Sequence, residues 1–366
     1  MKLNLLCMTK LKVGILYGGR SVEHGVSINS ARNIEAYIDK NQYETYCIGI
    51  STQGTWYATP TVSKEITKGR KLKLHLDGSC PRFEDEAGQV VALDVIFPVL
   101  HGTDGEDGSI QGLIKAMGLP MVGTGVLGSA VAMSKLVAKQ LMQQAGIPVT
   151  DFLFFRHGQE GEIKFEEVKE KLGLPFMVKA ANLGSSVGVS KVKSKEGFAD
   201  ALKDSFRYDD CVILEEYIKG REIECAILGN HPPEASLPGE IIINANYEFY
   251  TFDAKYVDGE AVKIDVPAQL DKKTSDLVRE YSIKAYRQLQ CEDFARVDLF
   301  VGENGKVYVN EINTIPGFTN SSMYPMMWKE RGVSFTQLIS RLIGLGMERH
   351  KEAQRTEKDF QSALKF

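Results

Sequence analysis

Several features that would place a chain in a special class are missing from this sequence. Its six cysteines are spread over 366 residues with no CxxC pair and no Cys/His spacing of a zinc site, so we predict that most are reduced core residues. The longest apolar runs, such as residues 91–100, contain Asp or Pro and fall far short of the ~20 residues that span a bilayer. The apolar stretch within residues 1–10 is too short for a signal peptide. These absences favour a cytoplasmic protein with no membrane partner.

A basic surface is also missing. The chain has 44 basic and 48 acidic residues, a formal net charge of −4, and no cluster of Lys and Arg that could follow a phosphate backbone, so we expect no nucleic-acid partner. What the sequence does have is an ordinary globular composition, 43% hydrophobic and 25% charged, in a chain long enough for two or three domains. Its 34 glycines indicate a backbone that often comes close to a neighbour.

The first third of the chain alternates expected strands and helices, the pattern of a parallel sheet with helices on its faces. We expect strands at residues 13–17, 43–50 and 94–100 and a helix at residues 26–38. Ligands of such sheets lie beyond the carboxyl ends of the strands. Two polar, glycine-containing loops follow strand ends here, at residues 18–24 and 101–108, and they are either ligand loops or ordinary turns.

The rest of the chain mixes strands and helices without an internal repeat. A helix is expected at residues 134–146, with a domain boundary near residue 130. Strands joined by short turns follow, and a third region contains a long helix at residues 272–289 and a hairpin. The predicted fold class is therefore α/β followed by α+β. The polar end, residues 348–366, is expected to be a solvated helix or a frayed terminus.

One glycine cluster imitates a dinucleotide-binding fingerprint. Residues 123–128 match GxGxxG, precede an expected helix and have Asp151 about 20 residues further on. However, only two apolar residues stand directly before the cluster, and Asp151 opens the next strand, whereas a ribose-binding acid closes one. We predict tight packing of a turn against a helix rather than a nicotinamide or flavin site. No GxxxxGK[ST] sequence occurs, which excludes a P-loop.

The most informative stretch is an expected hairpin around Asn304 and Gly305, a dipeptide that strongly indicates a tight turn. If these two residues form the loop, the register of both strands follows by counting back, and the period of two puts the paired polar residues on one face. The pairs so predicted are Glu303 with Lys306, Asp298 with Glu311 and Arg296 with Asn313.

Two directly opposed carboxylates repel each other unless a cation lies between them or one is protonated. Asp298 and Glu311, with Asn313 beside them and no His or Cys nearby, form an all-oxygen ligand set. Such a set suits Mg²⁺ or Mn²⁺ bound together with phosphates, and Glu311 is placed to bridge two ions. The alternative is an exposed hairpin with polar outer residues, against which the large apolar residues at the other strand positions argue.

A second candidate site is a Gly/Ser loop, residues 182–188, between an expected strand ending in Lys179 and a strand at residues 189–192. Its N–H and hydroxyl groups can fold over a triphosphate while Lys179 adds a point charge, although plain hairpin loops also have this composition. Further on, an apolar strand ends in Glu215 and Glu216. These carboxylates either bind the amino group of adenine or a ribose, or they simply end the strand.

Taken together, these residues resemble the ATP-grasp family, and in particular the D-alanine:D-alanine ligases, from residue 13 to about residue 345. The matching stretches are residues 18–24, 100–108, Lys179 with residues 182–188, residues 254–256, 296–298 and 310–314, and Pro316 with Gly317. The resemblance implies an ATP-grasp fold with an N-terminal open parallel-sheet, Rossmann-like domain. The implied parts are an N-terminal α/β substrate domain (1–130), a central ATP-grasp lid with the phosphate loop (131–227), a C-terminal ATP-grasp domain with the metal hairpin (228–350) and a polar tail (351–366).

The resemblance also implies a reaction. ATP phosphorylates the carboxylate of one D-alanine, and the amine of a second D-alanine attacks this acyl phosphate to give D-alanyl-D-alanine for peptidoglycan precursor synthesis. The implied partners are ATP and D-alanine, with two Mg²⁺ ions that Mn²⁺ can replace, and the chain is expected to form a homodimer.

Site residues are implied in the same way. Glu23 holds the ammonium of the first D-alanine, and Ser185 and Tyr256 join it in a hydrogen-bond set that closes the site. His101 falls near this pocket, either as a site residue or as a packed histidine.

For the second half of the reaction, the resemblance implies that Arg296 and the N–H of Gly317 stabilise the oxyanion and that Ser322 receives the carboxylate of the second substrate. The implied ATP contacts are Lys135, Lys179, Ser186, Glu215, Glu216, Ile218, Glu222, Lys255, Phe300 and Asn310, and the implied metal ligands are Asp298, Glu311 and Asn313.

Two departures and several alternatives stay open. Gly25 and Ala180 stand where many relatives carry an acid and a proline, which bears on local loop rigidity. By the same resemblance, Tyr256 favours D-alanine over D-lactate as the second substrate, and D-alanine:D-lactate and D-alanine:D-serine ligases stay alternatives. A nicotinamide-dependent oxidoreductase using residues 123–128 would leave the hairpin carboxylates without a purpose. A nucleotide-binding protein without catalysis is a further alternative, against which the intact set of implied catalytic residues argues.

Overall fold

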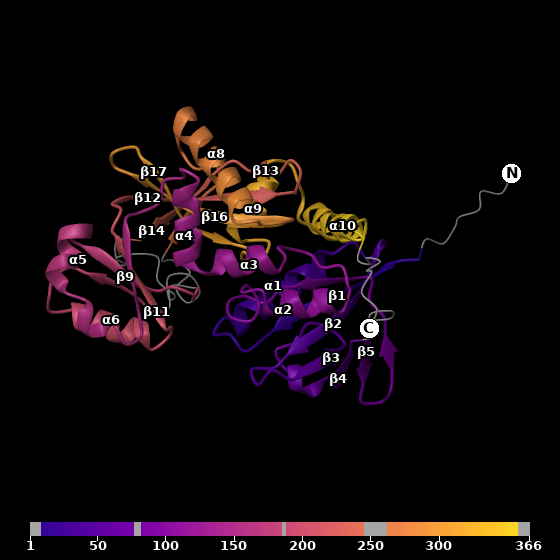
Figure 1. Ribbon diagram of the computed structural model, residues 1–366. Helices are drawn as coiled ribbons and strands as arrows, with labels where there is room; N and C mark the ends of the chain where they lie inside the picture. The colour runs from indigo at the N-terminus through magenta and orange to yellow at the C-terminus, as the bar shows by residue number, and fades with distance from the viewer. Residues whose placement is uncertain (1–8, 77–81, 185–187, 245–261, 358–366) are drawn as a thin grey trace, which may run out of the picture.

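The computed structural model describes residues 9–76, 82–184, 188–244 and 262–357, and their strands form three sheets. In Figure 1 the first sheet lies at the lower right, the second at the left and the third above and between them. The three sheets occupy residues 11–98, 152–216 and 220–313 in turn. The domain limits expected from the sequence stay a proposal.

The first sheet has seven strands in the order β6-β5-β4-β3-β2-β1-β7. Its elements are β1 (Leu11–Gly18), α1 (His24–Tyr37), β2 (Tyr43–Ile50), β3 (Trp56–Thr59), β4 (Arg70–His75), β5 (Arg82–Asp85), β6 (Val90–Val91), β7 (Val95–Pro98) and α2 (Ser109–Ala116). β1 pairs in parallel with β2 and β7, as predicted, because α1 and the long connection to β7 cross over between parallel strands. Strands β3 to β6 extend the sheet in antiparallel pairing, which the sequence did not predict.

The second sheet has four antiparallel strands in the order β10-β9-β11-β8. Its elements are β8 (Phe152–Arg156), α5 (Phe165–Leu172), β9 (Phe176–Ala180), β10 (Val189–Val192), α6 (Phe198–Phe206) and β11 (Cys211–Glu216). Three aromatic rings, those of Phe165, Phe176 and Phe198, meet edge to face or tilted at 5.5 to 6.1 Å and fasten both helices to the sheet. The other face of this sheet is therefore the one left for a ligand.

The third sheet has the order β15-β14-β12-β16-β17, with β13 also paired to β12. Its strands are β12 (Gly220–Leu228), β13 (Glu234–Ala235), β14 (Gly239–Ile243), β15 (Val262–Asp265), β16 (Phe294–Gly302) and β17 (Val307–Asn313). The helices of this part are α3 (Val126–Met133), α4 (Lys135–Gln144), α8 (Lys272–Gln288), α9 (Met323–Glu330) and α10 (Phe335–Ala353). Short 3-10 turns lie at Ile66–Lys68 and Glu160–Glu162.

A shared hydrophobic core joins the first and third sheets. Phe97 of β7, Phe294 of β16 and Trp328 of α9 are all buried in it, together with apolar residues of α10. Figure 1 shows α10, in yellow, lying beside the indigo N-terminal elements although it follows them by about three hundred residues. This packing fixes the loops of the first sheet against the loops that leave the third.

The β16–β17 hairpin confirms the predicted register at the carboxylates and corrects the predicted loop. Asp298 pairs with Glu311 and Arg296 with Asn313, as expected. However, Gly302 rather than Glu303 pairs with Lys306, so the loop has three residues, and Gly305 adopts a φ of +74° in it. An irregularity between Asp298 and Leu299 leaves Asn310 as an extra residue on β17. The two one-residue departures cancel, because the bulge restores the register that the longer loop had shifted.

The GxGxxG cluster packs as predicted. Gly123 donates its N–H to Asp293 Oδ2 at 2.8 Å, and Gly125 donates its N–H to Glu292 Oε2 at 3.0 Å. A Cβ on Gly128 would lie 2.2 Å from the carbonyl oxygen of Gln290, so this position needs glycine for close backbone contact. The helix that starts here therefore meets carboxylates of its own chain.

The cysteine prediction is confirmed where it can be checked. Cys47, Cys211, Cys225 and Cys291 are free and buried, while Cys7 and Cys80 lie outside the described residues. None of the helices in the described ranges has the length and apolar character that a bilayer crossing requires.

Candidate active site

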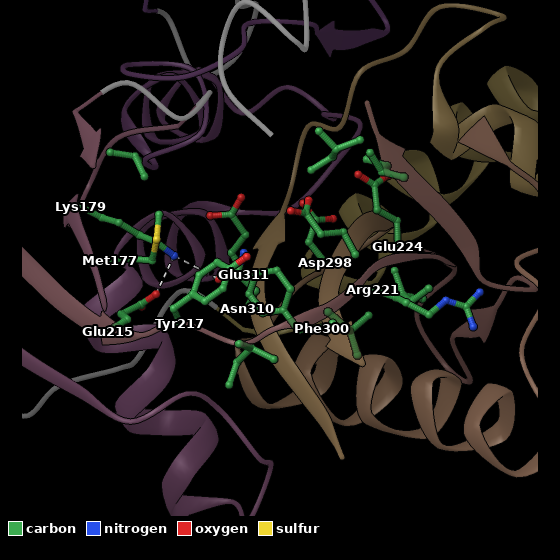
Figure 2. A pocket seen from close by; sticks show the side chains of 18 of the residues that line it. Met177, Lys179, Glu215, Tyr217, Arg221, Glu224, Asp298, Phe300, Asn310 and Glu311 are labelled. Atoms are coloured by element: carbon green, nitrogen blue, oxygen red, sulfur yellow. Dashed lines mark hydrogen bonds and ion pairs between the residues drawn. The ribbon is translucent and has the colours of Figure 1, made fainter. Parts of the chain in front are cut away.

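A cavity of about 420 Å³ lies between the second and third sheets. It is lined by residues of β9, β10, β11, β12, β14, β16 and β17 and by the first residue of α4. Figure 2 shows lining side chains from β9, β11, β12, β16 and β17. All the predicted ATP contacts within the described residues line this cavity, namely Lys135, Lys179, Glu215, Glu216, Ile218, Glu222, Phe300 and Asn310. Ser186 and Lys255 lie outside the described residues.

One end of the cavity holds a buried carboxylate between two lysines. Lys179 Nζ donates to Glu215 Oε2 at 2.6 Å, the contact dashed in Figure 2, and lies 3.5 Å from Asn310 Oδ1. Lys139 of α4 lies 3.1 Å from Glu215 Oε1 and donates to Thr150 Oγ1 at 2.8 Å. Burying three charges together is tolerated because opposite signs alternate.

The lysines decide the charge of this carboxylate. Burial alone would raise the pKa of Glu215, but Lys139 and Lys179 more than offset it and hold that pKa at about 2. Burial opposes the charge of Lys179, yet Glu215 raises the pKa of Lys179 above its ordinary value. Burial lowers the pKa of Lys139 by more than Glu215 restores. Glu215 is therefore an anion and Lys179 a cation at neutral pH.

Two of the predicted metal ligands, Asp298 and Glu311, line another part of the cavity. Arg296 grips Asp298 with two hydrogen bonds of 2.7 Å, from Nε to Oδ1 and from Nη2 to Oδ2. Asn313 Nδ2 donates to Asp298 Oδ2 at 2.9 Å, and Glu311 Oε2 lies 3.1 Å from Lys135 Nζ. The four hairpin residues thus share one face, as predicted, and cations of the chain balance the opposed carboxylates.

The donor set of this part fits a magnesium ion. Asp298 lies between Glu224 on β12 and Glu311 on β17, so three adjacent strands carry an acid in one row. In the described part of the chain no three His, Cys, Asp or Glu side chains are close enough to hold a metal by themselves. Mg²⁺ typically takes one or two carboxylates and completes its shell with phosphate oxygens and water. Asp298 and Glu311, with the amide of Asn313, supply that share.

Among the residues of the site that the sequence reasoning missed are these four: Met177, Tyr217 and Glu224, which line the cavity, and Lys139, which contacts Glu215. Lys191 Nζ lies 3.7 Å over the ring of Tyr217. Spacing could have found three of the four: Met177 and Glu224 stand two residues from the predicted contacts Lys179 and Glu222 on strands, and Lys139 stands one helical turn after Lys135.

The predicted first-substrate residue Glu23 lies beside this cavity. It is buried at the N-terminus of α1. A Cβ added to Gly102 would lie 2.5 Å from Glu23 Oε2, and one added to Gly184 would lie 3.4 Å from the same oxygen. Gly184 also lines the cavity. Gly184 thus lies between the carboxylate of Glu23 and the nucleotide-sized cavity.

His101 is a buried histidine that ties two regions together. Its Nδ1 lies 2.9 Å from the carbonyl oxygen of Ile315, and its Nε2 lies 2.9 Å from Ser30 Oγ. Because a carbonyl only accepts, Nδ1 carries the proton, and Nε2 accepts from Ser30. Burial lowers the pKa of His101, so the ring is neutral. Ser30 Oγ also accepts the N–H of Phe318 at 3.3 Å, which fixes the loop that contains Gly317.

Glu106 completes this corner with a second carboxyl group. Its Oε2 accepts the N–H of Gly102 at 2.9 Å, and its Oε1 accepts the N–H of Ile315 at 3.1 Å. Burial, with Glu23 as a further cause, raises the pKa of Glu106 to about 8. Glu106 is therefore mainly protonated at neutral pH.

Gly317 and Ser322 lie together on the loop after β17. A Cβ on Gly317 would be 3.3 Å from Ser322 Oγ. The Ser322 hydroxyl accepts the N–H of Thr319 at 3.0 Å and lies 2.7 Å from Thr319 Oγ1. Two other predicted catalytic residues, Ser185 and Tyr256, lie outside the described residues.

Two family models match the chain. The model described as "D-ala D-ala ligase N-terminus" matches residues 12–124, and the one described as "D-ala D-ala ligase C-terminus" matches residues 141–344.

Relatives and solved structures agree with this match. The chain is 44% identical to the D-alanine–D-alanine ligase of Oceanobacillus iheyensis and to D-alanine–D-alanine ligase A of Escherichia coli, each over 94% of this chain and 97% of the relative. The structure resembles the D-alanine-D-alanine ligase from Coxiella burnetii, with a TM-score of 0.85, 38% identity and coverage of 94% and 96%. It also resembles the VanG D-Ala:D-Ser ligase from Enterococcus faecalis, with a TM-score of 0.84, 34% identity and coverage of 92% and 100%.

Proposed function

The chain belongs to the D-alanine–D-alanine ligase family, and from that premise we propose that it joins two D-alanine molecules in an ATP-dependent reaction through an acyl phosphate. ATP leaves as ADP and phosphate, and the product is a precursor for peptidoglycan. One observation carries the proposal for this chain: Gly184 lines the cavity that holds the predicted ATP contacts and also abuts the carboxylate of Glu23. A phosphate and a substrate amino acid can therefore meet there.

Residues of the second and third sheets together would bind the adenine end of ATP. Met177, Ile218 and Phe300 provide apolar walls, and the ionised Glu215 accepts a hydrogen bond from the adenine amino group. Glu222 of β12 would accept from the ribose hydroxyls. Such a pocket holds the base by shape and by a few directed polar contacts.

The lysines and the hairpin acids would bind the phosphates and their metal ions. Lys135 and Lys179 line the cavity as cations that offset the charge developing on the transferred phosphoryl group. Asp298, Glu311 and Asn313 would hold one or two Mg²⁺ ions, with Mn²⁺ as a substitute. When bound, the ions supply charge neutralisation and orientation of the phosphate oxygens.

Glu23 would receive the ammonium of the first D-alanine. Glu106 is mainly protonated and His101 is neutral, so the charge that this corner offers to the ammonium is that of Glu23. We propose that Ser185 and Tyr256 complete the hydrogen-bond set around it.

Formation of the peptide bond needs donors for an oxyanion and an anchor for the second D-alanine. The backbone N–H of Gly317 is held in place through the His101–Ser30–Phe318 contacts and would donate to the oxyanion together with Arg296. Ser322, adjacent to Gly317, would bind the carboxylate of the second substrate. We further propose that the protein acts as a homodimer and in the cytoplasm, where its ATP is available.

The proposal is tested by phosphate release from Mg-ATP with D-alanine, D-serine, D-lactate or L-alanine. We expect D-alanine alone to stimulate release and to give D-alanyl-D-alanine by mass spectrometry. Because a D-Ala:D-Ser ligase is among the similar structures, D-alanine is also offered together with D-serine or D-lactate. A mixed product that outweighs the D-alanine dipeptide would reassign the second substrate, and no stimulation by D-alanine would overturn the proposed function.

A further inference from the structure

A fully buried lysine next to the cavity has no part in the reaction as described. Lys139 of α4 is 0% exposed and does not line the cavity. Its ammonium contacts Glu215 Oε1 at 3.1 Å and the Thr150 hydroxyl at 2.8 Å. A lysine loses rotamer entropy and hydration when it is buried this deeply. Such a costly residue calls for a reason.

Lys179, the other lysine that contacts Glu215, is placed differently. Lys179 on β9 does line the cavity, and besides its bond to Glu215 Oε2 it approaches Asn310 Oδ1 at 3.5 Å on the third sheet. Lys179 can therefore reach a phosphate in the cavity, whereas Lys139 cannot. The two lysines hold opposite oxygens of one carboxylate, but only one of them faces the ligand.

The carboxylate between them keeps capacity for a ligand. Within the described residues Glu215 Oε1 accepts no well-aligned hydrogen bond, so the Lys139 contact is an ion pair that leaves lone pairs available. Glu215 lines the cavity although it is only 1% exposed. If a phosphate drew Lys179 away in a chain without Lys139, Glu215 would be a buried charge with no counterion, which is strongly unfavourable.

We propose that Lys139 is a positioning residue for nucleotide recognition: it keeps Glu215 ionised and oriented toward the purine, so that Lys179 can turn from Glu215 to the phosphates. This proposal rests on the nucleotide site of the proposed function. The proposal assigns different roles to Lys139 and Lys179 because they lie on different sides of Glu215. Lys139 sets base selectivity through Glu215, and Lys179 serves the phosphates.

The division predicts an effect on one atom of the base. Adenine presents an amino donor at position 6, whereas hypoxanthine presents an oxygen acceptor there. An ionised, oriented Glu215 accepts from the amino group and repels the oxygen. Losing Lys139 should therefore weaken adenine binding while hypoxanthine binding changes far less. A lysine that only stabilised the fold would change both nucleotides alike.

The experiment measures binding of Mg-ADP and Mg-IDP by isothermal titration calorimetry to the wild-type chain, Lys139→Met and Lys139→Arg. We expect the wild type to prefer ADP. In Lys139→Met the ADP affinity should fall on the order of 10- to 100-fold, the range for a hydrogen bond to a charged group, and the preference should collapse. Lys139→Arg, which keeps the positive charge, should retain most of the preference.

Two further variants separate positioning from stability. Met142→Ala removes a buried side chain from the same helix and should lower the melting temperature while the ADP/IDP ratio stays as in the wild type. Lys139→Met combined with Glu215→Gln removes one charge of each sign, so the net charge of Lys139, Glu215 and Lys179 together stays as in the wild type. Within the Glu215→Gln background, Lys139→Met should no longer change the ratio.

Three results would overturn the proposal: a wild-type ADP/IDP ratio in Lys139→Met, a ratio in Met142→Ala that shifts as much as in Lys139→Met, or an undiminished effect of Lys139→Met in the Glu215→Gln background. None of these measurements uses D-alanine. Normal selectivity without D-alanine-stimulated phosphate release would therefore count against the proposed reaction alone, and the reverse result against Lys139 alone.

Discussion

Two carboxyl groups near the site, Glu215 and Glu106, have pKa values shifted in opposite directions. Burial raises the pKa of both groups when it acts alone. For Glu215 two lysines reverse the effect and bring the pKa to about 2, whereas Glu106 rises to about 8. The partners of a buried acid, rather than its burial, decide its charge.

The kind of partner explains the difference. Glu106 accepts two backbone N–H groups, from Gly102 and Ile315, which orient the carboxyl group but bring no net charge, and Glu23 lies nearby with the same sign. Glu215 meets two ammonium groups. The nucleotide cavity is thus built from paired charges, and the first-substrate corner from a neutral histidine and a protonated acid around Glu23.

The substitution with the largest expected effect on activity is in the nucleotide cavity. Glu311→Gln keeps the shape of the side chain but removes the charge that faces Lys135 at 3.1 Å and that would bind the metal. We expect turnover to fall by about 100-fold or more and the magnesium requirement to rise, since ligand changes at metal sites have effects of this size. Phosphate release as a function of Mg²⁺ concentration measures both.

A matched control for that variant is Glu303→Gln at the tip of the same hairpin. Glu303 is exposed and contacts Lys219. Its loss should leave turnover and magnesium dependence as in the wild type. Normal turnover of Glu311→Gln at ordinary Mg²⁺ concentrations would sink the metal assignment.

The next effect belongs to the other region. Gly102 has a φ of +76°, and an added Cβ would lie 2.5 Å from both Glu23 Oε2 and Ser21 Oγ. Gly102→Ala should therefore displace Glu23 and reduce kcat/KM for D-alanine by about 10- to 100-fold, as misplacement at a reacting centre does. Mg-ADP affinity, measured by calorimetry, should stay unchanged. A parallel loss of ADP binding would show that the two regions are not separable.

The hairpin shows how far the sequence could predict this site. The Asn304-Gly305 signal and the period of two were enough to pair Asp298 with Glu311. They did not reveal that the loop has a third residue or that Asn310 is bulged, because both departures depend on how β17 packs in the sheet and not on a local pattern. The full set of predicted ATP contacts came from the family resemblance, and the fold places those in the described residues around one cavity.

Other features needed the three-dimensional structure. Lys139 has the sequence context of an ordinary helix lysine, and its partner Glu215 lies 76 positions further along the chain. His101 bonds to Ile315, 214 residues away. Contacts over such separations arise only when the sheets assemble, so composition and spacing cannot predict them.

A third prediction concerns the pH dependence of Glu106. Its pKa is about 8 in the folded protein, against an ordinary value of 4.5. Between pH 4.5 and pH 8 the folded state therefore keeps a proton on Glu106 that the unfolded state has lost. This stabilising contribution is complete below about pH 4.5 and is lost as the pH rises through about 8. Glu106→Gln should remove that part of the decline. Melting temperatures between these two pH values measure it, and only the slope is diagnostic, because the amide also changes the hydrogen bonds. An unchanged slope would refute the assignment.

The smallest effect tests burial itself. Lys219 and Glu303 form the same kind of pair as Lys179 and Glu215, at 2.9 Å, but their side chains are 76% and 64% exposed. Water already solvates both charges and salt screens them, so Lys219→Ala should leave the melting temperature unchanged within error, at about 0.1 M and at about 1 M salt alike. The buried group of Lys139, Glu215 and Lys179 should behave differently, because water cannot replace a lost partner there. Lys179→Met should therefore lower the melting temperature at both salt concentrations. A drop in melting temperature for Lys219→Ala as large as that for Lys179→Met would contradict this expectation. Opposite charges alone, without burial, would then explain the low pKa of Glu215, and the contrast between the nucleotide cavity and the first-substrate corner would lose its physical basis.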